Sequence, residues 1–278
     1  MTGHKEPTGM ATSLRCPLFV PATRAGLIPK AQASGADSVI VDLEDAVAMD
    51  RKDEARDALA AFLANDPEAR VIVRINAADS GELDADLALC EGHAGIAGIM
   101  SPKAESRGAL ERVARLGKPV WPLLETPAGV LALESLTRVA GVEQFAFGAL
   151  DFAFEANLTP DSDGGRAVLD YARHQLLMHS HAAGLMPPLE SVYPDFKSPE
   201  RLHAIALRAR DMGFGGMLCI HPAQIETVRT AFSPSEDELG WAQRVMDASR
   251  RNSGAFQVDG QMVDAPVLAR AQRILALN

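Results

Sequence analysis

Two runs, Pro122-Leu-Leu-Glu-Thr-Pro-Ala-Gly129 and Phe147-Gly-Ala-Leu-Asp-Phe152, predict both the fold and the site of this chain. Each starts as an apolar, strand-like stretch and reaches one carboxylate, Glu125 or Asp151, where a turn begins. In a barrel of alternating strands and helices, the carboxyl ends of the strands form the mouth where active sites lie. Two carboxylates that meet there would make an oxygen-only site suited to Mg2+.

Short apolar runs alternate with helical patterns along most of the chain. Strands are predicted at 18–20, 38–43, 71–75, 98–101, 120–124, 144–147, 188–192 and 216–220, and helices at 51–64, 106–116, 166–183, 199–212 and 223–231. Most strand runs are continuously apolar, as in parallel strands buried on both faces. Gly35, Gly117, Gly184 and Gly213 each stand where a helix should end in a left-handed residue. Eight repeats in 278 residues predict an α/β fold, a (β/α)8 TIM barrel.

The predicted barrel covers residues 14–232, between two different ends. The polar segment 1–13 is expected to be disordered. A C-terminal helical extension, 233–278, starts with a capping box at Ser235 and ends in a helix at 266–275. It exceeds what eight repeats need, so pattern alone leaves it as packing material or a lid.

Composition excludes several function classes. The net charge is −10 and the chain has no basic block, so no nucleic-acid partner is expected. No apolar run approaches the roughly 20 residues that span a bilayer, so no membrane association is expected. Three well-separated cysteines and a polar N-terminal segment predict reduced thiols and a cytoplasmic location.

Further charged residues follow the predicted strands. Asp42, Glu44 and Asp45 come after the second strand, and Arg74 lies inside the third. An arginine in an apolar strand needs a carboxylate from the protein or from a ligand. Each residue also has a structural alternative: Glu125 and Asp151 as helix caps, the acidic run as solvated surface, and Arg74 in a structural ion pair.

Mg2+ on two carboxylates, with a nearby arginine, favours carbon–carbon chemistry beside a carbonyl. The metal could chelate a 2-oxo acid while the arginine neutralises the developing oxyanion. Schiff-base aldolase chemistry would need a buried lysine instead, and Lys103 is the one candidate at a strand end.

The chain resembles citrate lyase beta-subunit-like proteins of the HpcH/HpaI aldolase superfamily. Seven runs in order carry the resemblance: RCPLFVP (15–21), VDLEDAV (41–47), VRIN (73–76), PKAE (102–105), LETPAG (124–129), FGALDF (147–152) and LCIHPAQ (218–224). The tail 254–268 looks like the end segment of malyl-CoA, citramalyl-CoA and beta-methylmalyl-CoA lyases of this group.

The resemblance implies roles for particular residues. Glu125 and Asp151 would hold Mg2+ (Mn2+ is possible) and the substrate, and Arg74 would polarise the substrate oxygen. Glu44 and Asp45 match catalytic-site positions near the metal's waters. Leu150 stands where a polar residue is common, so the pocket wall is expected to be more apolar.

The tail and the CoA contacts follow from the same resemblance. Asp264 would be the general acid or base, carried by a lid into a neighbouring subunit's site, which implies a homotrimer or hexamer. Its alternative is to cap the helix that starts at Pro266. Arg24, Lys30, Arg51 and Lys52 are the candidate contacts to the CoA part of the substrate.

The leading hypothesis is a Mg2+-dependent lyase that cleaves a dicarboxylic 3-hydroxyacyl-CoA to an acyl-CoA and a 2-oxo acid, or runs the reverse condensation. Three alternatives stay open. They are a citrate lyase beta subunit acting on an acyl-carrier-protein thioester, a malyl-CoA thioesterase, and a non-catalytic barrel that binds CoA thioesters.

Overall fold

The computed structural model describes residues 14–252 and 254–277 of the chain. The segment 1–13, predicted to be disordered, lies outside the described residues. The chain divides into two compact units, Met1–Arg229 and Thr230–Asn278. The division falls inside one helix, so the predicted boundary after residue 232 and the lid role of 233–278 stay predictions.

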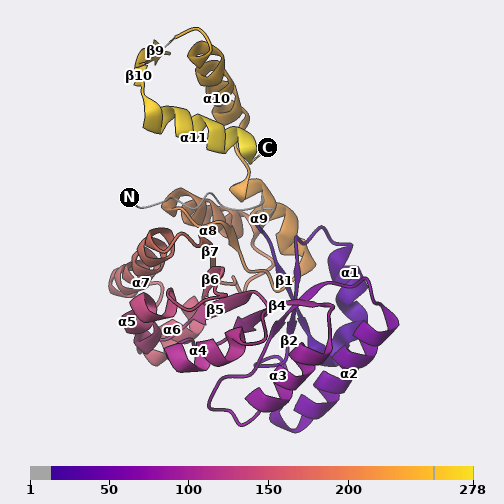
Figure 1. Cartoon of the computed structure of the whole chain (residues 1–278). Coiled ribbons are helices and arrows are strands. Elements are labelled where there is room, and N and C mark those ends of the chain that lie inside the picture. Colours follow the sequence, from indigo (N-terminus) through magenta and orange to yellow (C-terminus); the bar gives the residue numbers. More distant parts are fainter. Residues whose placement is uncertain (1–13, 253, 278) are drawn as a thin grey trace. The chain divides into compact units, whose positions relative to one another are not determined.

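A parallel sheet of eight strands is the centre of the first unit (Figure 1). Its strands, in sheet and chain order, are β1 (Leu18–Pro21), β2 (Val39–Asp42), β3 (Val71–Arg74), β4 (Ile96–Ser101), β5 (Val120–Leu124), β6 (Gln144–Phe147), β7 (Met186–Glu190) and β8 (Gly216–Met217). An isolated parallel bridge joins Leu18 to Cys219, just after β8. The sheet is therefore curled as in a TIM-like barrel, which supports the predicted fold class.

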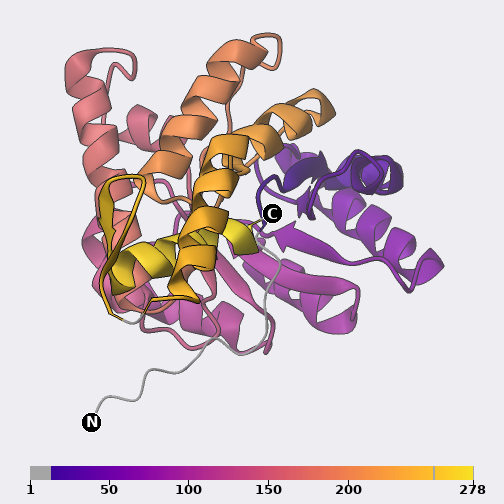
Figure 2. The same cartoon turned by 90° about the horizontal axis from the view of Figure 1, so that it is seen from above.

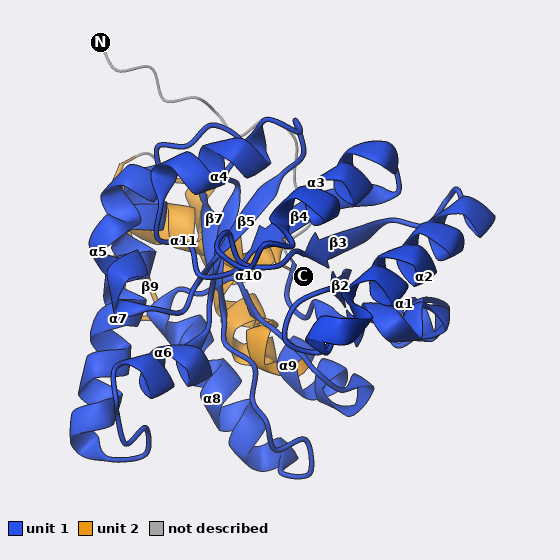
Figure 3. Ribbon diagram, turned by 90° about the horizontal axis from the view of Figure 1, so that it is seen from below, with its two compact units in different colours: residues 1–229 blue, residues 230–278 orange. Residues whose placement is uncertain are grey.

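Helices follow the strands around the outside of the sheet (Figures 2 and 3). The α-helices are α1 (Ile28–Gln32), α2 (Lys52–Asn65), α3 (Leu83–Gly92), α4 (Arg107–Ala114), α5 (Pro127–Leu136), α6 (Ala149–Glu155), α7 (Asp163–Ala182), α8 (Pro199–Met212) and α9 (Ile225–Phe232). Short 3-10 helices are η1 (Ala22–Leu27), η2 (Met49–Arg51) and η3 (Pro222–Gln224).

The inner face of the sheet is filled by apolar side chains from successive strands. They are Ile40, Ile72, Met100, Trp121, Leu123, Ala146, Leu189 and Leu218. Because neighbouring residues on the same strands are also buried, both faces of the sheet are covered, as expected for a parallel sheet under helices.

The four predicted helix-stop glycines are confirmed. Gly35, Gly117, Gly184 and Gly213 all have positive φ, from 68° to 108°. The predicted strands lie on the observed ones, but several bounds differ by one to three residues. The seventh strand begins earlier, at Met186, and the eighth ends at Met217, because the chain beyond it keeps only the single bridge at Cys219.

The second unit has a helical hairpin with a small sheet. Its elements are α10 (Glu236–Ser249), β9 (Phe256–Val258), β10 (Gln261–Val263) and α11 (Ala265–Ala276). The capping box at Ser235 is confirmed: its hydroxyl accepts from the amide of Glu238, and its amide donates to that carboxylate. The antiparallel hairpin was not predicted. Asp259 and Gly260, both at positive φ, form its two-residue turn, as Asp-Gly pairs commonly do.

Across the described ranges 14–252 and 254–277, no helix combines the length and apolarity that crossing a bilayer would need.

Candidate active site

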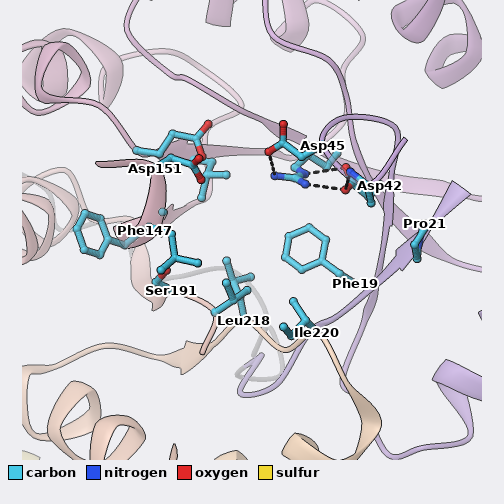
Figure 4. A pocket seen from close by; sticks show the side chains of 16 residues that line it. Phe19, Pro21, Asp42, Asp45, Phe147, Asp151, Ser191, Leu218 and Ile220 are labelled. Atoms are coloured by element: carbon cyan, nitrogen blue, oxygen red, sulfur yellow. Dashed lines mark hydrogen bonds and ion pairs between the residues drawn. The ribbon is translucent and has the colours of Figure 1, made fainter. Parts of the chain in front are cut away.

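The carboxyl ends of the first three strands are aligned at one edge of the sheet. Pro21 pairs with Asp42, and Asp42 pairs with Arg74, so their side chains reach the same mouth. A cavity of about 370 Å³ opens there (Figure 4). Its lining residues are Phe19, Pro21, Asp42, Asp45, Ala46, Arg74, Leu123, Glu125, Phe147, Gly148, Leu150, Asp151, Ser191, Val192, Leu218 and Ile220.

Arg74 is held by the acidic run after β2. Its Nε and one terminal nitrogen donate to the two carboxylate oxygens of Asp42, at 2.7 and 2.6 Å. The other terminal nitrogen lies 2.9 Å from Glu44 Oε2 and 3.5 Å from Asp45 Oδ2. The acids are therefore not all solvated surface, because Asp42 and Glu44 are buried partners of the arginine.

The contacts keep Arg74 charged. Burial opposes its charge, but the hydrogen bonds and charge of Asp42 outweigh burial and raise the pKa of the guanidinium. The Cζ atom of Arg74 also lies 5.0 Å from the centre of the Phe19 ring, a favourable cation–π distance. The guanidinium is thus a fixed positive charge at the cavity.

Burial has the larger effect on the carboxyl of Glu44. Burial raises the pKa of its carboxyl to about 8, since the opposing effect of Arg74 is smaller. The ion pair to Arg74 lacks hydrogen-bond geometry, so Glu44 Oε2 accepts no hydrogen bond among the described residues.

Glu125 faces the cavity instead of capping a helix. Thr126 caps α5 by accepting from the amide of Gly129, while Glu125 Oε1 accepts from the backbone amide of Lys103 at 2.7 Å. Burial is the largest effect on Glu125 and raises its pKa to about 7, and the charge of Asp151 adds to the rise. The capping alternative does not describe Glu125.

Asp151 lies one helical turn beyond the strand end where sequence placed it. Strand β6 stops at Phe147, and Asp151 projects from the first turn of α6. The start of α6 is tied to β7, because the amide of Ala149 donates to Ser191 Oγ at 3.0 Å. Ser191 was missed in the sequence because it lies inside the run 188–192 predicted as a strand; a polar residue within that run could have signalled it.

A buried ion pair holds the strand before Ser191. Arg173 of α7 donates through two nitrogens to Glu190, at 2.8 and 3.0 Å. Glu190 also accepts from the amide of Ser191 at 2.9 Å. This network fixes Ser191 and, through Ala149, the helix that carries Asp151.

Lys52 stabilises the loop after β2. Its side chain is buried, and its ammonium group donates at 2.7 Å to each of the carbonyls of Leu43 and Glu44. It therefore braces the acidic loop from inside, and this position does not support the CoA contact predicted for it.

The other predicted CoA contacts are exposed. Arg24 lies in η1, Lys30 in the last turn of α1, and Arg51 at the end of η2, where it pairs with Glu54. Lys103, the one candidate for Schiff-base chemistry, is exposed and does not line the cavity, so a buried amine is not found there.

Asp264 caps α11 in this structure. Its Oδ1 accepts from the amide of Val267 at 3.3 Å, which is the structural alternative considered for it. Because Asp264 belongs to the second unit, its predicted role in a neighbouring subunit stays a prediction.

The carboxylates fit a hard cation. The charge of Asp151 raises the pKa of Glu125, so the two carboxylates repel each other, and a bound Mg2+ would remove that repulsion. Over residues 14–252 and 254–277, no set of three or more acids, histidines or cysteines is grouped for a metal. The chain would then supply two ligands and leave the rest to water and substrate, as is usual for Mg2+.

The comparison with protein families decides the class of the chain. The profile of the HpcH/HpaI aldolase/citrate lyase family matches residues 15–222. This chain belongs to the HpcH/HpaI aldolase/citrate lyase family. The resemblance seen in the sequence is confirmed.

Individual members of the family are similar over nearly their whole length. A citrate lyase subunit beta-like protein of Deinococcus radiodurans is 36% identical over 281 residues, 95% of this chain and 96% of that protein. A (3S)-malyl-CoA thioesterase of Cereibacter sphaeroides is 35% identical, covering 96% and 95%. The solved structure of CitE from Mycobacterium tuberculosis, in complex with magnesium, acetoacetate and coenzyme A, matches with a TM-score of 0.86, 37% identity and coverage of 95% and 98%.

Proposed function

We propose that the chain is a cytoplasmic, Mg2+-dependent carbon–carbon lyase. Its substrate would be a dicarboxylic 3-hydroxyacyl-CoA, such as malyl-CoA or citramalyl-CoA, and its products an acyl-CoA and a 2-oxo acid; the reverse condensation is equally open. The observation that carries the proposal is that Glu125, Asp151 and Arg74 line one cavity. The magnesium and coenzyme A in the M. tuberculosis relative support it.

The cavity residues have separate tasks in this proposal. Glu125 and Asp151 hold Mg2+, which when bound supplies positive charge beside the oxygens of the 2-oxo acid. Arg74 faces the oxygen on which negative charge builds, and Asp42 keeps its guanidinium in position. Glu44 and Asp45 shape the same side of the cavity.

Proton transfer is assigned to Asp264. In the cleavage direction it removes the proton of the 3-hydroxyl, the carbon–carbon bond breaks, and the enolate of the acyl-CoA takes up a proton. We propose that the segment 233–278 acts as a lid over the site of a neighbouring subunit in a homotrimer or hexamer. Arg24, Lys30 and Arg51 remain the proposed contacts to CoA.

A second candidate is thioester hydrolysis. The 35% identity to a (3S)-malyl-CoA thioesterase favours it, since the same metal and acid–base group can serve either reaction. A citrate lyase beta subunit or a non-catalytic CoA-thioester-binding barrel would give no turnover of a free CoA ester.

Product analysis with malyl-CoA and citramalyl-CoA tests the assignment. We expect Mg2+-dependent release of a 2-oxo acid and an acyl-CoA, and loss of that release in Asp151→Asn with the fold retained by circular dichroism. Asp57→Asn, at an exposed position of α2, is the matched control and should behave as wild type. Free CoA with an intact hydroxy diacid would establish the thioesterase, and full activity of Asp151→Asn would refute the metal assignment.

A further inference from the structure

The cavity has two chemically different sides. The acids Asp42, Asp45, Glu125 and Asp151 gather with Arg74, whereas Phe19, Leu123, Phe147, Leu150, Val192, Leu218 and Ile220 supply apolar surface. In Figure 4 the labelled acids lie along one side, and Phe19, Leu218 and Ile220 lie along the other. A ligand held at the acids therefore directs the rest of its body toward hydrocarbon.

The cationic side chain of the cavity is already paired with acidic side chains. Among the described residues that line it, Arg74 is the one cation, and it contacts Asp42, Glu44 and Asp45. Lys52, close by in sequence, is bound to two backbone carbonyls behind the acidic loop. A Mg2+ ion would neutralise Glu125 and Asp151. No further positive charge then remains, among the described lining residues, for a second carboxylate of a ligand.

A 2-oxo acid presents a carboxylate and a carbonyl oxygen to a metal, and only the substituent on its carbonyl carbon varies. A hydrogen or a short alkyl group can lie against apolar side chains at no electrostatic cost. A second carboxylate in the same place would lose part of its hydration against these apolar side chains and would meet no free cation among the described lining residues, which is unfavourable.

Among the apolar residues that line the cavity, Leu150 is the one directly adjacent in sequence to a proposed metal ligand. It directly precedes Asp151 in the first turn of α6, lines the cavity and is 47% exposed. Leu150 and Asp151 both line the cavity, so a 2-oxo acid held at Asp151 would be within the same cavity as the Leu150 side chain.

We propose that Leu150 determines specificity, so that the site accepts a 2-oxo acid whose carbonyl carbon carries hydrogen or a small alkyl group and discriminates against one with a second carboxylate. Pyruvate represents the accepted class and oxaloacetate the rejected one. The proposal rests on the proposed function, because it assumes that Glu125 and Asp151 hold Mg2+.

Calorimetric titration of the full chain in excess Mg2+ tests this selectivity. Pyruvate and freshly dissolved oxaloacetate are titrated into wild type, Leu150→Arg and Leu131→Arg. We expect wild type to bind pyruvate at least about tenfold more tightly, and Leu150→Arg to bind oxaloacetate at least about tenfold more tightly than wild type does. Leu131, 88% exposed on α5 and away from the cavity lining, is the charge-matched control and should leave both affinities unchanged.

The outcomes separate the two proposals. If wild type shows Mg2+-linked binding but takes oxaloacetate as tightly as pyruvate, the selectivity is refuted and the metal assignment stands. If neither 2-oxo acid shows Mg2+-linked binding to folded wild type, both are refuted. If Leu150→Arg does not fold, Leu150→Ser is used: a fall of about threefold or more in the preference for pyruvate supports the role of Leu150, and an unchanged preference overturns it.

Discussion

Gly148 gives the most direct structural test of the carboxylate pair. It lies between β6 and α6, and a Cβ atom there would be 2.6 Å from Glu125 Cβ and 2.9 Å from Glu125 Oε2. Its φ of −107° and ψ of 75° do not require glycine, so the consequence of Gly148→Ala is steric. The added methyl must push Glu125 away by about 0.8 Å, the difference between 2.6 Å and the 3.4 Å at which ordinary contact begins.

That displacement is large for a metal site and moderate for the fold. Mg2+ needs oxygen ligands at about 2.0–2.1 Å in near-ideal geometry, and a misplacement near 1 Å typically costs about 100-fold in turnover. Overpacking of one methyl costs about 1–3 kcal/mol of unfolding free energy. We therefore expect Mg2+ affinity to fall at least tenfold and turnover about 100-fold in a protein that still folds.

Calorimetric Mg2+ titration, turnover and urea unfolding of Gly148→Ala measure the three quantities. Gly92→Ala is the control, because a Cβ at Gly92, the last residue of α3, meets nothing within 4 Å. It should match wild type in Mg2+ affinity. Unchanged Mg2+ affinity in folded Gly148→Ala would show that the position of Glu125 does not govern metal binding, and the reasoning would be wrong.

Three further substitutions test two supports of the site and one hydrogen-bond network before the second strand. Lys52→Met removes the ammonium group from two loop carbonyls and should lower the unfolding free energy by about 2 kcal/mol in urea titration, with Lys30→Met as an exposed control; equal stability of the two variants would contradict the bracing role. Ser191→Ala leaves the amide of Ala149 without its acceptor and should cost about 1 kcal/mol and weaken Mg2+ binding, whereas wild-type values for both would remove Ser191 from the positioning network. For Asp37, burial favours the neutral carboxyl, but hydrogen bonds from Cys16, Arg15 and Arg229 outweigh burial and lower its pKa below the usual 3.8. The stability that ionised Asp37 contributes is therefore complete above pH 3.8, and it is lost as the pH falls through the lower pKa of the folded protein. The difference in unfolding free energy between wild type and Asp37→Asn should accordingly be constant from pH 5 to 7 and should shrink below about pH 3.8. A difference that grows on acidification would contradict the lowered pKa.

Local signals predicted the parts of the fold that depend on neighbouring residues. The helix-stop glycines and the capping box at Ser235 act within a few residues, and both are confirmed. Helices α1, α3 and α6 and the hairpin at 256–263 were missed. The α6 pattern is short and apolar next to an apolar strand, so periodicity alone could not separate the two.

In the site, likewise, the contacts between residues distant in sequence were not predicted. The pairing of Arg74 with Asp42 joins residues 32 apart, and Ser191 reaches Ala149 across 42 residues. The register of adjacent parallel strands creates both contacts, and sequence spacing contains no information about register. Lys52 looked like a surface cation because its helix begins with charged residues, yet its ammonium group is buried against the carbonyls of Leu43 and Glu44.

The sequence by itself determined the alternation of strands and helices, the family and the identity of the acidic residues at the mouth, because apolar periodicity, turn glycines and motif order are properties of short segments. The tertiary structure decided which acids hold Arg74, which face the cavity, and that Leu150 and Ser191 line it with them. Those choices depend on strand register and burial, which arise only when all eight strands meet in one sheet.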